Sequence, residues 1–307
     1  MYNSGMTGKF RILSIDGGGL KGLIAIKILQ AIERLTGKAV KDQFDLFAGT
    51  STGGLIVSAL ACARSEEEEE YNLDHIETMY LEVGQELFRQ GGLSYSEEDV
   101  KTFDGLLERT FDGYMLSQTL SPVFVPTYDV ANKKVVIFKT RSAKNEPSKN
   151  VTLHQVCRAT TAIPPVFPVY IMQYHNRELR AADAGPYLKN PAVSALAEVW
   201  KHKAYYASPD LKEEDVVLLS VSTGNYRTQG AEWTTDIRSV LSAQEMDMEY
   251  IRSQNLKIDF AKVNYLRVDM NLGGSPFSLA QILHWIKKIQ DLSGNRAFEQ
   301  AVIRLLG

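Results

Sequence analysis

The strongest chemical signal in the sequence is a serine enclosed by glycines, in the segment Gly49-Thr50-Ser51-Thr52-Gly53-Gly54. A Gly-x-Ser-x-Gly motif between a buried strand and a helix is typical of a nucleophile elbow, a sharp turn that exposes the serine hydroxyl. The N-terminus of the following helix favours negative charge that develops beside it. Ser51 is therefore the predicted nucleophile, supported by Gly49 and Gly53. The alternative is an ordinary polar turn in which Ser51 or Thr52 caps the helix.

A second glycine-rich turn precedes it and reads Asp16-Gly17-Gly18-Gly19-Leu20-Lys21-Gly22. Consecutive glycines let a backbone approach a ligand closely with its N–H groups turned inward. A dinucleotide site would need an acidic residue at the end of the second strand, but that strand ends in the serine turn. We therefore expect the amides of Gly17, Gly18 and Gly19 to form an oxyanion hole facing Ser51. Lys21 either adds positive charge to this site or covers it from solvent.

The nucleophile needs a group that accepts its proton. No histidine lies in a recognisable catalytic turn; the five are His75, His154, His175, His202 and His284. The best-placed carboxylate is Asp183, which follows an apolar stretch and precedes the turn Gly185-Pro186. Asp183 is the predicted base, with Gly185 in support. Its alternative role is to cap that turn.

Short apolar runs and apolar residues at helical spacing follow one another along the chain and predict the strands and helices that position these turns. Strands are expected over 10–16, 44–48, 123–130, 134–139, 167–172 and 216–221. Helices are expected over 20–35, 55–63, 73–88 and 151–159, a flexible loop over 90–104, and a mostly helical tail over 231–307. A strand, a helix, a strand and a helix in this order indicate a parallel sheet covered on both faces.

Taken together and in this order, the three motifs resemble those of the patatin-like phospholipase family. Further matches are Gln43 to Ala48, Tyr128-Asp129, Arg158 to Pro168 and Asn190-Pro191, so the resemblance covers about residues 10–225. One departure is Ala184, where the family has glycine after the catalytic aspartate, and another is Lys189 in place of asparagine. The resemblance implies an α/β fold, a three-layer α/β/α sandwich with a mostly parallel sheet. It also implies a catalytic domain over 10–225 and a helical C-terminal extension over 226–307 packed on the same domain.

The family resemblance further implies a phospholipase A-type lipid acyl hydrolase that uses a Ser51–Asp183 dyad and an acyl-enzyme, without a metal or other cofactor. Segments that contain Tyr80, Phe88, Leu93, Phe103 and Leu107 are candidates to line an acyl-chain site, although each could simply be core. Two alternatives stay open. The hydrolase could be an antiviral effector that degrades membranes when a cyclic nucleotide activates it, with Arg227 as a candidate contact. Or the chain could be a non-catalytic lipid-binding scaffold.

Composition and charge exclude several other classes of protein. The 307 residues are 44% apolar and 23% charged, with a net charge of −3, which excludes wholesale disorder and fibres. Without a basic excess we expect no nucleic acid polymer as partner, and the acidic block 66–70 is expected to be a solvated segment.

Cys62 and Cys157 predict neither a disulfide framework nor a metal site. With no signal peptide or spanning segment, we expect a cytoplasmic protein that acts at the membrane surface on phospholipids; a homo-oligomer is compatible with the sequence.

Overall fold

The computed structural model of the chain describes residues 8–62, 72–87, 96–111, 113–225, 233–234, 257–270, 272, 289 and 294–307. The segments 66–70 and 90–95, together with Phe88, Leu93, Arg227 and His284, lie outside these residues, so the predictions made for them stay predictions.

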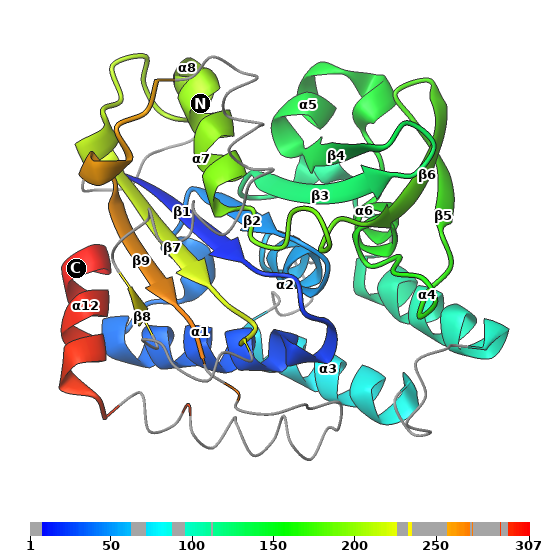
Figure 1. Cartoon of the computed structure of the whole chain (residues 1–307), viewed down its shortest axis with the longest axis horizontal. Helices are drawn as coiled ribbons and strands as arrows, with labels where there is room; N and C mark the ends of the chain where they lie inside the picture. Colours follow the sequence, from blue (N-terminus) through cyan, green and yellow to red (C-terminus); the bar gives the residue numbers. More distant parts are fainter. Residues whose placement is uncertain are drawn as a thin grey trace.

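One mixed sheet forms the centre of the molecule (Figure 1). Its strands are β1 (Phe10–Ile15), β2 (Leu46–Gly49), β3 (Val123–Asp129), β4 (Lys134–Lys139), β5 (Tyr170–Tyr174), β6 (Arg177–Asp183), β7 (Val216–Val221), β8 (Trp233–Thr234) and β9 (Asn264–Val268). The spatial order is β5-β6-β3-β2-β1-β7-β9-β8, and β4 also pairs with β3. The five strands from β3 to β9 in that order pair in parallel, whereas β4, β5, β6 and β8 add antiparallel pairs.

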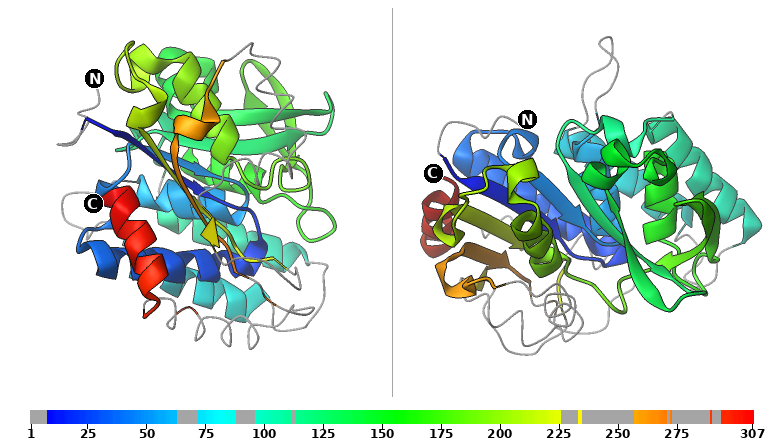
Figure 2. Two further views of the ribbon diagram at one scale, coloured as in Figure 1. Left: turned by 60° about the vertical axis from the view of Figure 1, so that its left-hand side comes forward. Right: turned by 90° about the horizontal axis from the view of Figure 1, so that it is seen from above.

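Helices cover both faces of this sheet. They are α1 (Gly22–Thr36), α2 (Thr52–Leu60), α3 (Leu73–Leu87), α4 (Glu97–Phe111), α5 (Thr140–Asn145), α6 (Leu153–Thr160), α7 (Ala192–Lys201), α8 (Lys203–Tyr206) and α12 (Arg296–Leu306). Short 3-10 turns span Gly19–Lys21, Val40–Asp42, Leu116–Gln118, Pro147–Lys149, Glu213–Asp215 and Phe260–Lys262. Figure 2 shows α7 and α8 on one face and α1, α2 and α12 on the other. This is the predicted three-layer architecture.

The core lies in two layers because successive strand residues point to opposite faces. In β1, Leu13 and Ile15 pack into the layer that contains α1 and α2. Phe10 and Ile12 pack into the layer that contains α7. All four side chains are buried, which explains why the central strands read as continuous apolar runs rather than alternating ones.

The segment 97–111 is a helix, α4, so the expectation of a loop up to residue 104 is wrong. A reciprocal cap begins it: Asp99 Oδ2 accepts from the Ser96 N–H at 2.8 Å, and Ser96 Oγ accepts from the Asp99 N–H at 3.2 Å. Its first turn is acidic, which suits the positive end of the helix dipole. The buried side chains Phe103 and Leu107 stand one turn apart, a helical signal that the polar neighbours obscured.

The C-terminal tail is not purely helical. β9 lies in the central sheet beside β7, and its register runs from Asn264 opposite Val217 to Val268 opposite Val221. The strand forms because β7 offers an unpaired edge and because apolar side chains of 264–268 are buried on both faces of the sheet. α12 does fulfil the helical expectation. The predicted division at residue 225 stays a prediction, although β9 completes the same sheet as β1.

Candidate active site

Ser51 sits at the turn between β2 and α2 in a backbone conformation that side chains rarely adopt. Its φ is 55° and its ψ is −121°, and such strain costs about 1–3 kcal/mol. The Ser51 N–H donates to Thr160 Oγ1 at 2.9 Å, and Thr160 Oγ1 donates to the Pro126 carbonyl at 2.6 Å. Two buried hydrogen bonds therefore tie the turn to α6 and β3. The geometry is that of the predicted nucleophile elbow.

The flanking glycines permit this turn to close. A Cβ added to Gly49 would stand 2.2 Å from the Gly53 carbonyl oxygen, and one added to Gly53 would stand 2.3 Å from the Ile15 carbonyl oxygen. Real Cβ atoms do not approach backbone so closely, so only glycine fits at either position. The predicted supporting roles of both glycines have this steric basis.

Asp183 lies at the end of β6, where the fold brings it to Ser51. The Ser51 side chain lies close enough to the Asp183 carboxyl group to lower its pKa. The Gly185 N–H donates to Asp183 Oδ1 at 2.6 Å, and the Asp183 N–H donates to the Ala162 carbonyl at 2.7 Å. Burial raises the pKa of Asp183 to about 6, and the hydrogen bonds from Ser51 and Gly185 oppose that rise. A carboxylate that titrates near this pH can act as a base at neutral pH.

Ala184 does not disturb the turn after Asp183. It is fully buried, and its carbonyl accepts hydrogen bonds from the N–H groups of Tyr187 at 2.8 Å and Leu188 at 2.7 Å. Ala184 is not among the residues with positive φ. Because the turn needs no left-handed residue there, alanine serves as well as glycine.

The glycine turn after β1 faces the same place but does not contribute all three predicted amides. The Gly17 N–H donates to the Lys189 carbonyl at 2.9 Å, so Gly17 is corrected from an oxyanion donor to a structural link. No described residue accepts a hydrogen bond from the N–H of Gly18 or Gly19. Gly19 has a φ of 57° and lines the same cavity as Ser51. Among the described residues, the N–H groups of Gly18 and Gly19 are therefore available to donate hydrogen bonds to a bound ligand.

Asp16 and Lys21, at either end of this turn, have different surroundings. Asp16 is 1% exposed and forms a two-pronged ion pair with Arg267 of β9, with N–O distances of 2.8 and 2.6 Å. Arg267 Nη1 also donates to Ser220 Oγ at 2.7 Å. Burial and, to a smaller extent, the positive charge of Lys189 lower the pKa of Lys21 to about 8, against the opposing effect of Asp16 and Asp269. Lys21 therefore stays mostly charged at neutral pH beside the turn.

An apolar cavity of about 110 Å³ opens at Ser51. Its walls come from α2, α3, α4 and the segment after α6, and include the predicted Tyr80, Phe103 and Leu107. Phe103 and Phe167 stack with ring centroids 4.8 Å apart. α4, which the sequence did not predict, thus supplies one wall. The site has the apolar lining that a hydrocarbon chain requires.

Sequence reasoning missed two residues that hold this site together. Thr160 falls within the family-like stretch Arg158 to Pro168, and Arg267 falls within the tail that the sequence predicts to be mostly helical. Thr160 gives no distinct signal, because its helix also carries the polar residues His154, Gln155 and Arg158. Arg267 gave no local signal, because 251 positions separate it from Asp16.

None of the described histidines, His75, His154, His175 and His202, lines the cavity. Within the described ranges, no group of three or more histidine, cysteine or acidic side chains could hold a metal ion. Among the helices that the structure describes, none combines the length and the apolar character needed to cross a membrane.

Comparison with known proteins finds relatives in one family. The family model of the patatin-like phospholipases matches residues 13–196. The chain is 31% identical over 246 residues to patatin-like protein 2 of Arabidopsis thaliana, covering 71% of this chain and 60% of that protein. It is 30% identical over 214 residues to patatin-like protein 2 of Oryza sativa subsp. japonica, covering 62% and 53%. Among solved structures, VipD from Legionella pneumophila aligns with a TM-score of 0.47 and 12% identity, covering 97% of this chain and 67% of that one. We draw nothing from so distant a structural likeness.

The chain belongs to the patatin-like phospholipase family, since the family model covers more than half of it. It spans only 53% to 60% of the length of these two relatives, so what the whole proteins do does not transfer with membership. The matched range 13–196 contains the serine turn, the glycine turn and Asp183.

Proposed function

We propose that the chain is a lipid acyl hydrolase of the phospholipase A type. The observation that carries the proposal is Ser51, held in a strained turn, beside the buried carboxyl group of Asp183 and at an apolar cavity. A nucleophile with a proton acceptor in contact can attack an ester, and the cavity offers the acyl chain an apolar environment.

The first half-reaction transfers the acyl group to the protein. Asp183 in its ionised form accepts the Ser51 hydroxyl proton as Ser51 Oγ bonds to the ester carbonyl carbon. The N–H groups of Gly18 and Gly19 and the N-terminus of α2 stabilise the negative charge that develops on the carbonyl oxygen. The bond to the alcohol oxygen then breaks, and the leaving alcohol takes the proton from Asp183.

The second half-reaction releases the fatty acid. A water molecule loses a proton to Asp183 and attacks the carbonyl carbon of the acyl-Ser51 ester. The N–H groups of Gly18 and Gly19 again stabilise the negative charge that develops on the carbonyl oxygen. The bond to Ser51 Oγ breaks, and Ser51 recovers its proton from Asp183. No histidine takes part in this reaction sequence, and none of the four histidines that the structure describes lines the cavity.

Replacing Ser51 tests this function. Ser51→Ala should lower hydrolysis of both a fluorescent phospholipid and a short water-soluble ester by at least about 10³-fold, because the nucleophile is lost. Ser208→Ala, at an exposed serine far along the chain, should keep full activity. Circular dichroism checks that both variants are folded. Undiminished hydrolysis by a folded Ser51→Ala protein would remove the proposal.

A further inference from the structure

A buried cation that takes no part in the reaction lies behind the wall of the cavity. Arg158, on α6, is only 2% exposed and does not line the cavity, so its guanidinium group meets neither solvent nor substrate there. Removing a charge from water is costly unless nearby groups compensate it. The groups around Arg158 therefore show which parts of the fold this charge joins.

The ion pair of Arg158 reaches α4, the helix that forms one wall of the cavity. Arg158 Nε lies 2.8 Å from Asp104 Oδ1. Neither atom has a hydrogen-bond partner among the described residues, so the contact is held by opposite charge rather than by an aligned donor and acceptor. Asp104 directly follows Phe103, which lines the cavity. The pair thus fixes this part of α4 to α6.

The same guanidinium group also contacts a second wall, the segment that follows α6. Its Cζ lies 5.2 Å from the centre of the Phe167 ring and 5.4 Å from that of the Tyr170 ring. A cation over an aromatic face is attracted to it, and more strongly when both are shielded from water. Phe167 lines the cavity, and its ring stacks on Phe103 of α4 where the two walls meet. Arg158 therefore contacts one wall directly and the other through Asp104.

The contacts of Arg158 are separate from those that hold the nucleophile. The Ser51 turn is tied to α6 and β3 through Thr160, not through Arg158. α4 also buries apolar side chains of its own, so the helix stays packed when the ion pair is lost. Losing the pair should therefore loosen the junction of the two walls and leave the catalytic atoms in place.

We propose that Arg158 is a positioning residue for the acyl chain. It holds the α4 wall against the wall that contains Phe167, and so makes the cavity select long acyl chains over short ones. The inference rests on the proposed function, because the acyl chain must occupy this cavity. Each methylene that loses contact with the walls lowers the affinity about fourfold. The effect of Arg158 therefore grows with the length of the chain and is smallest for an acetyl group beside Ser51.

Steady-state hydrolysis of two nitrophenyl esters, the acetate and the octanoate, tests this role. Arg158→Met removes the charge and keeps an unbranched, apolar side chain. It should raise KM for the octanoate at least about tenfold and change KM and kcat for the acetate much less. Asp104→Asn, a milder change at a side chain that is 33% exposed, should act in the same direction and carries the test if Arg158→Met does not fold.

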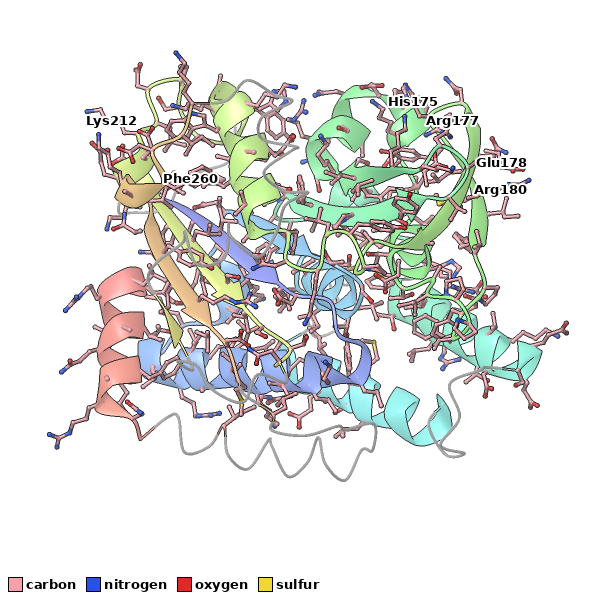
Figure 3. All side chains as sticks on the ribbon, viewed as in Figure 1. His175, Arg177, Glu178, Arg180, Lys212 and Phe260 are labelled. Carbon is pink, nitrogen blue, oxygen red and sulfur yellow. The ribbon has the colours of Figure 1, made fainter. Side chains whose placement is uncertain are left out.

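The matched control is Arg180→Met, which breaks an exposed ion pair. Arg180 Nε lies 2.8 Å from Glu178 Oε1, and Figure 3 shows both labelled side chains pointing outward from β6. This variant should keep the wild-type KM for both esters. The proposal is overturned by equal losses for both esters in the folded Arg158 or Asp104 variant, by an unchanged octanoate KM, or by the same change in Arg180→Met. Unfolding midpoints identify a temperature at which every variant is folded.

Fatty acid binding separates this inference from the proposed function. In the Ser51→Ala background, adding Arg158→Met should weaken the binding of cis-parinaric acid, a fluorescent fatty acid, at least about tenfold. Unchanged binding overturns the inference even if Ser51 is the nucleophile. Hydrolysis of the acetate by proteins with and without Ser51 judges the proposed function by itself, since the acetyl group depends least on the two walls.

Discussion

The burial of Asp183 favours its role as a base but lowers the stability of the folded protein. Burial raises its pKa to about 6, so that the ionised form is disfavoured in the folded protein yet still dominates at neutral pH. The hydrogen bonds from Ser51 and Gly185 limit that rise. A base of this strength is strong enough to accept a proton and weak enough to return it. Activity and stability therefore make opposite demands on this residue.

Asp183→Asn should abolish hydrolysis while making the protein more stable at pH 7.5. The folded pKa lies above the unfolded value, so the destabilisation is absent below about pH 4 and complete above about pH 6. Removing the charge should raise the free energy of unfolding by about 3 kcal/mol at pH 7.5 and by less than about 1 kcal/mol at pH 4. Urea unfolding at the two pH values measures this. A gain of equal size at both would contradict the assigned burial.

The same titration shapes the rate of the wild-type protein. Hydrolysis of a water-soluble ester should increase with pH through an apparent pKa of about 6 as Asp183 ionises. It should decline again around pH 8, as Lys21 loses the charge that its burial already disfavours. Lys21→Arg should keep the acid limb and move the alkaline limb upward, since arginine stays charged. A profile in which Lys21→Arg leaves the alkaline limb in place would remove Lys21 from the site.

At the scale of elements, the turn between β2 and α2 depends on glycines for space, not only for flexibility. Gly53→Ala brings a Cβ within 2.3 Å of the Ile15 carbonyl, so we expect a loss of stability of about 3 kcal/mol or more. Gly105→Ala on α4 is the matched control, because its nearest neighbour is the flexible Arg109 side chain at 3.6 Å. It should stabilise α4 by about 0.5–1 kcal/mol. Thermal unfolding would disprove the steric account if both variants behaved alike.

Some elements can be predicted from the sequence alone, and others cannot. The turns around Ser51 and Gly18 could be predicted because a strand, a glycine run and a helix follow one another along the chain. α4 escaped prediction since its first turn is acidic and its apolar side chains are few, yet it forms one wall of the cavity. β9 escaped because pairing with β7, a tertiary contact, decides its structure.

At the scale of the whole molecule, the C-terminal part of the chain reaches the glycine turn that follows β1. Arg267 pairs with the buried Asp16, and both lie close to Ser220, whose hydroxyl accepts from Asn190 Nδ2 at 3.2 Å. This network joins the glycine turn to the segment that follows Asp183. The family model ends at residue 196, so Arg267 lies beyond the matched range. No local pattern could have predicted a contact across 251 positions.

A double-mutant cycle tests that connection. Arg267→Met leaves Asp16 buried and unpaired, and should cost about 3–5 kcal/mol of stability together with most of the ester hydrolysis. Adding Asp16→Asn removes the unpaired charge and should recover part of the stability, with a coupling energy above about 2 kcal/mol. Urea unfolding of the four proteins gives that coupling. Strictly additive losses would mean that the two side chains act independently.

The most direct test of the central claim is an intact-mass measurement of the protein mixed with a slowly hydrolysed ester. If Ser51 is the nucleophile, one acyl group adds to each chain, and peptide mapping locates it on Ser51. Asp183→Asn should slow its formation, and Ser51→Ala should show no adduct. An acyl group on another residue, or ester hydrolysis that continues in Ser51→Ala without any adduct, would contradict the account.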